Sequence, residues 1–163
     1  RGTITMPEHP ELELTSKGDL FGPYAKMQKF LGERGVTEPR GQKMVGMEAH
    51  HLVEDRLLHH FGFSRDEAPS VAIYAHEHAE HVHGGDERVD IELKKGRVYD
   101  IDDVVDVHVS TYKAIGRSEW GERVKQYVAD NEARILEAYR SGAVLGATAA
   151  DVRRVEHFFQ TLR

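Results

Sequence analysis

Histidines and carboxylates gather in one stretch of this 163-residue chain. The segment Glu48-Ala49-His50-His51-Leu52-Val53-Glu54 sets two adjacent imidazoles between two carboxylates, and more histidines lie within residues 76–83. Neutral imidazole and carboxylate bind divalent metals, and imidazole is the one side chain whose ordinary pKa suits proton transfer near neutral pH. Such a doublet can give one ring to a metal ion and leave its neighbour as a base. This division suits metal-assisted hydrolysis of a phosphodiester.

The two rings of the doublet need a particular backbone to serve one site. On a regular strand, His50 would share a face with Glu48 and Glu54, whereas His51 would point to the other face. We therefore expect the strand to end or twist at the doublet. The alternative is a surface doublet on an edge strand.

A second histidine cluster occupies residues 76–83. In a helix, His78 and His81 are three residues apart and share a face, so both could reach one metal ion. The alternative is a solvated helix face. We expect the isolated histidines to be solvated or hydrogen-bonded surface residues: His9, His108 and His157.

Composition narrows the class of protein. The chain has no cysteine, which excludes disulfides, cysteine-based zinc sites and cysteine nucleophiles. No apolar run reaches the ~18 residues of a membrane span. The net charge of −6 disfavours unspecific binding to nucleic acid. Residues 50–111, which hold most of the histidines, carry six basic and fourteen acidic side chains, and a nuclease hypothesis must explain this excess.

The first half of the chain is predicted to be a mixture of short elements. Residues 1–22 are polar, with prolines at positions 7 and 10, and we expect a linker or arm. A helix is predicted from residue 23, with its apolar side chains on one face. Short strands are expected at residues 47–53 and 71–75, with one helical turn and a loop between them. A helix over residues 76–83 is expected next.

The second half is predicted to be helical. Residues 86–99 fit either a strand hairpin or an irregular loop. Three helices are expected within residues 101–163, and the middle one carries a single apolar stripe over residues 120–139. Thr148 and Asp151 resemble the capping box that opens the last helix. The pattern predicts an α+β fold that is mostly helical.

The doublet segment and the residues after it resemble a known family. Glu48-Ala49-His50-His51-Leu52-Val53-Glu54, then Ser70-Val71-Ala72-Ile73, then Glu77-His78, is similar to the HNH/endonuclease VII nucleases, whose site is a ββα-metal motif. The branch that it resembles is the nuclease domains of bacterial polymorphic toxins with an E-x-H-H…H signature. The likeness covers about residues 45–85. It implies one nuclease domain over residues 23–163, with the ββα-metal motif embedded among helices and a helical tail over residues 101–163.

The resemblance implies a role for each matching residue. His51 would be the general base, and His50 and His78 would bind the metal ion. Glu48 matches the acidic position and would be a ligand or would orient a histidine. Two further candidate metal ligands are Glu54 and His81. Basic side chains beyond the histidine helix could line the phosphate path, or could form a solvated loop: Arg88, Lys94, Lys95 and Arg97.

One departure from the family concerns the base. Many HNH members carry an asparagine between the two strands, which orients the base through its backbone. Residues 52–77 contain no asparagine here. We therefore expect another group, such as a backbone carbonyl, to hold the His51 imidazole in its working tautomer.

These observations predict a metal-dependent endonuclease, a hydrolase that uses one divalent ion, whether Mg, Mn, Zn or Ni. DNA is the expected substrate, and RNA stays open because the motif addresses the phosphate rather than the sugar. A cation would offset part of the acidic charge at the site. Two alternatives stay open: a non-catalytic, histidine-rich module that binds a divalent metal, and an adaptor whose helical tail binds a partner.

The resemblance also predicts a biological setting. The chain begins with Arg1, and we expect it to be the C-terminal toxin domain of a larger secreted polypeptide, an interbacterial effector. Such a domain would be secreted or injected and would act in the cytoplasm of the target cell. A cognate immunity protein is expected in the producing cell.

Overall fold

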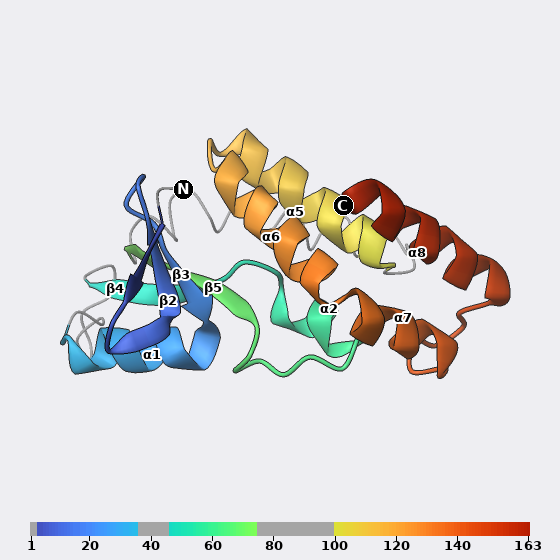
Figure 1. Cartoon of the computed structure of the whole chain (residues 1–163), viewed down its shortest axis with the longest axis horizontal. Coiled ribbons are helices and arrows are strands. Elements are labelled where there is room, and N and C mark those ends of the chain that lie inside the picture. The colour runs from blue at the N-terminus through green and yellow to red at the C-terminus, as the bar shows by residue number, and fades with distance from the viewer. Residues whose placement is uncertain (1–2, 36–45, 75–99) are drawn as a thin grey trace.

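The computed structural model describes residues 3–35, 46–74 and 100–163. Within these residues one sheet of five antiparallel strands is joined to a larger set of helices (Figure 1). The fold is α+β and mostly helical, which confirms the predicted class. The strands are β1 (Thr3–Met6), β2 (His9–Thr15), β3 (Leu20–Pro23), β4 (Met47–His51) and β5 (Pro69–Tyr74). The helices are α1 (Tyr24–Glu33), α2 (Asp55–His59), α5 (Ile101–Ala114), α6 (Ser118–Asp130), α7 (Glu132–Arg140) and α8 (Ala149–Leu162).

The expected linker over residues 1–22 is wrong, because β1, β2 and most of β3 lie there. The signal for a strand is Glu11-Leu12-Glu13-Leu14, which alternates charged and apolar side chains. Leu12 is fully buried and packs in the cluster beneath α1. Pro7 and Pro10 are the residues that argue for a linker, and Pro7 lies in the turn between β1 and β2. Pro10 lies where the register between β1 and β2 shifts, so its missing N–H interrupts no regular ladder.

The strand that carries the histidine doublet, β4, and the next strand along the chain, β5, are direct neighbours in the sheet. The strand order is β1-β2-β3-β5-β4, so β4 lies at one edge of the described sheet. β4 and β5 are antiparallel, with His50 opposite Val71 and His51 opposite Ser70. The pair of short strands predicted around residues 47–53 and 71–75 is confirmed, as is the helical turn between them, which is α2.

The sheet separates two hydrophobic clusters. Helix α1 covers one face, with Met27 and Phe30 packed near Ala49 of β4. The spacing of its apolar residues predicts this face. On the other side, Val71 of β5 belongs to the larger cluster that includes Trp120 and the rest of the C-terminal helices. Neighbouring residues of β4 and β5 therefore enter different cores, as period-two alternation requires.

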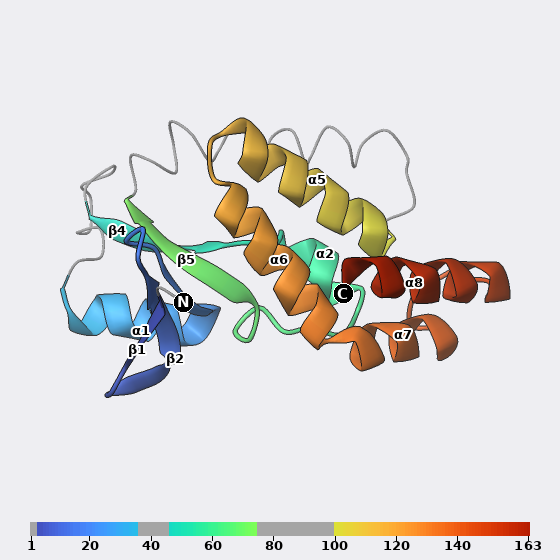
Figure 2. The same ribbon diagram turned by 45° about the horizontal axis from the view of Figure 1, so that its top comes forward.

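The predicted middle helix is interrupted at Asn131, so four helices lie after residue 100 instead of three. Helices α5 and α6 form an antiparallel pair, and α7 leaves the end of α6 in a new direction (Figure 2). The Asn131 side-chain amide donates to the Tyr127 carbonyl oxygen at 2.8 Å and so satisfies a group at the end of α6. Both helices still bury their apolar sides, which explains why a single stripe runs through the break.

Helix α8 begins as its sequence predicts. The Thr148 side chain accepts from the Asp151 N–H, and the Asp151 carboxylate accepts from the Thr148 N–H, which is the full capping box. The longest described helices have 14 residues. No described helix is both long enough and apolar enough to cross a membrane.

Candidate functional site

His51, the last residue of β4, lies on the sheet face that α1 covers. Its ring stacks on the Tyr24 ring, with centroids 3.8 Å apart and planes 14° from parallel. Its Nε2 lies 3.2 Å from the carbonyl oxygen of Arg65. Because a carbonyl oxygen only accepts, Nε2 carries the proton and Nδ1 is the unprotonated nitrogen of the neutral ring. A backbone carbonyl thus selects the tautomer of His51, in a segment that has no asparagine to do so.

Arg65 contacts this stacked pair a second time, through its side chain. Its guanidinium donates to the Tyr24 hydroxyl at 3.0 Å, and its Cζ lies 4.7 Å from the centroid of the Tyr24 ring. The Tyr24 hydroxyl also accepts from the Gln28 amide at 2.7 Å. We call His51, Tyr24 and Arg65 the His51 cluster. Its members come from β4, α1 and the loop before β5, so they are far apart in the sequence and meet only in the folded chain.

The loop of residues 62–68, which carries Arg65, is attached to the start of α1. The Tyr24 N–H donates to the Ala68 carbonyl at 2.8 Å, and the Ala25 N–H donates to the Asp66 carbonyl at 3.0 Å. The residue before α1, Pro23, has no side chain that can cap a helix. Loop carbonyls therefore satisfy N–H groups that the first turn would otherwise leave unpaired. This fixes the loop backbone relative to the Tyr24 ring.

A second attachment comes from α7. The Arg134 guanidinium donates to both carboxylate oxygens of Glu67, at 2.8 and 3.3 Å, and also to the Gly62 carbonyl. Its Cζ lies 4.2 Å from the centroid of the Phe63 ring. The same Glu67 carboxylate accepts from the Ser64 N–H at 2.7 Å. Arg134 thus ties both ends of the loop to the helical part of the molecule.

The Glu67–Arg134 pair should make stability depend on pH. The hydrogen bond from Arg134, followed by that from the Ser64 N–H, lowers the pKa of Glu67 below its ordinary value of 4.5. A lowered folded-state pKa stabilises the protein above the unfolded pKa, and this contribution is lost as the pH falls through the folded value. Glu67→Gln should therefore lower stability at pH 7 by about 1 kcal/mol or less, because both side chains are 42% exposed.

The measurement is thermal unfolding of both proteins at neutral and at acidic pH. The difference between wild type and Glu67→Gln should shrink as Glu67 becomes protonated. Glu137→Gln, an exposed change on α7, is the matched control and should leave the pH profile unaltered. A constant difference across the acidic range would contradict the assignment.

His50 lies on the opposite face of β4, against α5 and α6. It is 7% exposed, and its ring centroid is 6.0 Å from that of Trp120. The Tyr112 hydroxyl donates to the Leu52 carbonyl, so it accepts from His50 Nε2, which lies 3.1 Å away. His50 therefore carries a proton on Nε2, and in the neutral ring Nδ1 is the unprotonated nitrogen. A ring held in one tautomer by a neighbour is the usual form of a metal-ligating histidine.

The flanking carboxylates have different positions. Glu48 is half-buried on β4, opposite Ile73, and is two residues from His50, which places both on one face. Glu54 lies beyond the strand end and is the N-cap residue of α2. Its N–H donates to His108 Nε2 at 3.1 Å. Glu48 therefore shares the His50 face of β4, as the alternation of the strand predicts. Glu54 lies past the strand end, where its N–H contacts α5.

The prediction that His108 is a surface residue is wrong. It is 3% exposed, and its Nδ1 donates to the Val104 carbonyl at 2.7 Å while its Nε2 accepts from the Glu54 N–H. His108 lies four residues after Val104 on α5, at the spacing of the buried stripe, and this spacing is the signal for burial in the sequence. With both ring nitrogens in hydrogen bonds, His108 holds the chain after β4 against α5.

The structure does not bring the two rings of the doublet to one face. His50 faces α5 and α6, whereas His51 faces α1, as expected for neighbours on a strand. β4 does end at His51, which is one of the two conditions under which the doublet could serve a single site. A phosphate that meets both rings would have to lie at this strand end, at the edge of the described sheet.

Part of the predicted site lies outside the described residues. This is true of the helix expected over residues 76–83 and of the ligands and basic residues after β5: His78, His81, Arg88, Lys94, Lys95 and Arg97. The described part of the predicted ββα-metal motif is therefore its strand pair, with the doublet at the end of β4. The assignment of these residues stays a prediction.

One group of carboxylates among the described residues has the spacing of a cation site. Ligand atoms of Asp100, Asp102 and Asp103 lie within 4.8 Å of one another at the start of α5. The buried His50 and His108 are also of a kind that could hold a metal ion, although both ring nitrogens of His108 are already in hydrogen bonds. The Arg154 guanidinium already binds Asp100 at 2.8 Å and Asp102 at 2.6 Å. Arg154 thus supplies a cation to this group from within the chain.

Comparison of the chain with protein-family models, with curated proteins and with solved structures gave no match.

Proposed function

We propose that this chain is a metal-dependent endonuclease in which His51 is the general base. The contact between His51 Nε2 and the Arg65 carbonyl supports this most directly. It leaves Nδ1 as the nitrogen that can take a proton, on a half-buried ring at the end of a strand. A general base needs one tautomer and one orientation, and a typical contribution of such a base is a factor of ~10²–10⁴.

In the proposed reaction, His51 Nδ1 takes a proton from water, and the resulting hydroxide attacks phosphorus in line with the leaving 3′ oxygen. The product carries a 5′ phosphate. His50, with its Nε2 proton directed to Tyr112, would offer Nδ1 to a divalent ion, and His78 would be the second ligand. Such an ion, when bound, would neutralise charge on the phosphate and on the leaving oxygen.

The position of the substrate follows from the two faces of β4. Because His50 and His51 lie on opposite sides of the strand, we infer that the scissile phosphate lies at the strand end. β4 is the edge strand of the described sheet, so no described strand covers it on that side. The Arg65 side chain is exposed and stands over Tyr24, beside the proposed base. We propose that it binds a phosphate oxygen and so offsets part of the acidic charge around the site.

Arg65→Gln should weaken substrate binding more than it slows the chemical step. A guanidinium that donates to a phosphate contributes a charge-assisted hydrogen bond, so its loss should lower kcat/KM by roughly tenfold or more. The change should appear mainly as a rise in KM. Steady-state cleavage of a short duplex measures it, with Arg153→Gln on α8 as the control for loss of one exposed positive charge. Equal effects of the two variants would remove Arg65 from the site.

We further propose that this chain is the toxin domain of a larger secreted polypeptide, and that it is delivered into the cytoplasm of a target cell. An immunity protein would inhibit it in the producing cell. The support is the E-x-H-H doublet on the described strand pair. Expression in a bacterial cytoplasm tests it. The wild-type chain should stop growth and degrade the chromosome, and His51→Ala should not.

A second candidate function is a metal-binding module without catalysis. One observation supports it: side chains of kinds that can bind a metal ion occur both at His50 and at the start of α5. The two functions differ in a plasmid-cleavage assay with Mg, Mn, Zn or Ni and with a chelator as control. Nicking that depends on one of these ions supports the nuclease. Tight zinc binding without cleavage under any ion supports the module.

A further inference from the structure

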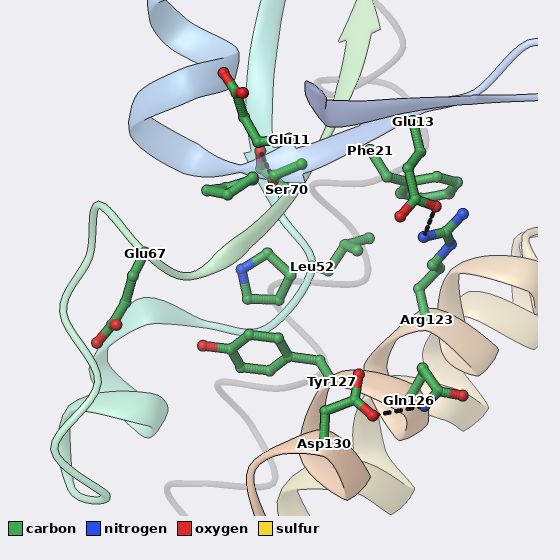
Figure 3. Close-up of a pocket in the computed structure, with 13 residues that line it drawn as sticks. Glu11, Glu13, Phe21, Leu52, Glu67, Ser70, Arg123, Gln126, Tyr127 and Asp130 are labelled. Atoms are coloured by element: carbon green, nitrogen blue, oxygen red, sulfur yellow. Dashed lines mark hydrogen bonds and ion pairs between the residues drawn. The ribbon is translucent and has the colours of Figure 1, made fainter. Parts of the chain in front are cut away.

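A pocket lies between the sheet and α6, apart from the His51 cluster (Figure 3). Its volume is about 200 Å³, and its apolar walls include Phe21 of β3, Pro69 of β5 and Leu52 after β4. Tyr127 of α6 adds its ring, and its hydroxyl points across the pocket. Burial raises the pKa of Tyr127 to about 12 from its ordinary value of 10, and the hydroxyl is protonated at neutral pH with or without this rise. We call this hollow the α6 pocket.

Two of the carboxylates that line the α6 pocket are neutralised within the chain. Arg123 binds Glu13 at 2.7 Å and stands over the Phe21 ring, with its Cζ 4.5 Å from the centroid. Arg134 binds Glu67 at 2.8 Å from outside the pocket. These contacts hold both guanidinium groups in place beside carboxylates, so neither is a ready partner for an anion.

Two further carboxylates line the pocket without such a cation. Among the described residues, neither Glu11 nor Asp130 forms an ion pair, and Asp130 accepts only the neutral Gln126 amide, at 2.8 Å. The pocket therefore combines apolar walls with an excess of negative charge at its rim. That combination suits an occupant with an apolar stem and a positive end.

We propose that the α6 pocket binds a lysine or arginine side chain presented by a partner protein. The volume is below the ~300–1,000 Å³ of typical small-molecule sites and suits one side chain. The rim charge repels phosphates, so nucleic acid is a poor occupant. The net charge of −6 likewise favours a basic protein surface as partner. Binding at this pocket does not depend on the proposed nuclease activity.

The test is an NMR titration of the isotopically labelled chain with Nα-acetyl-lysine-N-methylamide. Resonances of Phe21, Leu52 and Tyr127 should shift and saturate, with an affinity of about millimolar. The analogue with norleucine in place of lysine has the same stem without the ammonium group, and it should bind more weakly. The combined change Glu11→Gln with Asp130→Asn should weaken binding of the lysine analogue by roughly 3- to 10-fold, because two charge interactions at the pocket rim are lost.

Glu137→Gln is the matched control, since it removes an exposed carboxylate that does not line the pocket. Its affinity for the lysine analogue should equal that of the wild type. Three results would each overturn the proposal: no shift at these residues, equal binding of the norleucine analogue, or equal weakening by Glu137→Gln. Displacement of the lysine analogue by single-stranded DNA at the same resonances would assign the pocket to nucleic acid instead.

Discussion

His51→Ala should reduce metal-dependent cleavage by about 10²–10⁴-fold, to a level close to background in a plasmid assay. The physical reason is the loss of Nδ1, the nitrogen that the Arg65 carbonyl leaves unprotonated. Metal affinity should be nearly unchanged, because His51 faces α1 whereas the proposed ligand His50 faces α5 and α6. Nicking rates and metal binding by calorimetry measure the two effects separately.

His59→Ala is the control for this experiment. His59 is an exposed residue at the end of α2, next to His60 and away from the proposed site, so its loss should leave cleavage unaltered. Far-ultraviolet circular dichroism should show the same helix content in all three proteins. If His51→Ala nicks plasmid at the wild-type rate, another group is the base. If it also loses the metal ion, the division of labour within the doublet is wrong.

Tyr112→Phe should destabilise the protein by about 1–3 kcal/mol, although it removes one oxygen atom. The hydroxyl donates to the Leu52 carbonyl and accepts from His50 Nε2, and Tyr112 is 4% exposed. The substitution takes a partner from two groups at the end of β4. For a chain of this size the unfolding temperature should fall by about 2–4 °C per kcal/mol.

The same substitution should weaken the proposed binding of a metal ion at His50. Because the Tyr112 hydroxyl fixes the tautomer of His50, its loss should lower metal affinity by about 10- to 100-fold. Tyr127→Phe is the matched control, since that hydroxyl points into the α6 pocket. It should change neither unfolding temperature nor metal affinity by a comparable amount. A lower melting temperature with unaltered metal affinity would argue against His50 as a ligand.

Local patterns predict the elements whose neighbours in sequence decide their structure. The apolar spacing of α1, the capping box of α8 and the strand pair of β4 and β5 are each confirmed. In each case, burial and hydrogen bonding depend on residues a few positions apart. The alternation in β2 is equally local, and it is obscured by Pro7, which lies in the turn before β2, and by Pro10, which the register shift tolerates.

Local sequence patterns do not predict contacts between segments that are far apart in the chain. His108 reaches the Glu54 N–H, and Arg134 reaches Glu67, across more than fifty residues of chain. Arg65 has no motif of its own, because its backbone carbonyl rather than its side chain holds His51. Asn131 ends α6 although the apolar stripe continues, so the pattern alone does not separate one helix from two.

The contacts of Arg134 with the loop of residues 62–68 have a consequence for genetic experiments. If the active chain is lethal to its host, clones that survive its expression will have lost function by some route. Survivors should then carry changes not only at the doublet but also at Arg134 and Glu67, since a loosened loop would no longer aim the Arg65 carbonyl. Sequencing of such escape clones would therefore identify the side chains far from His51 that keep the proposed base in position.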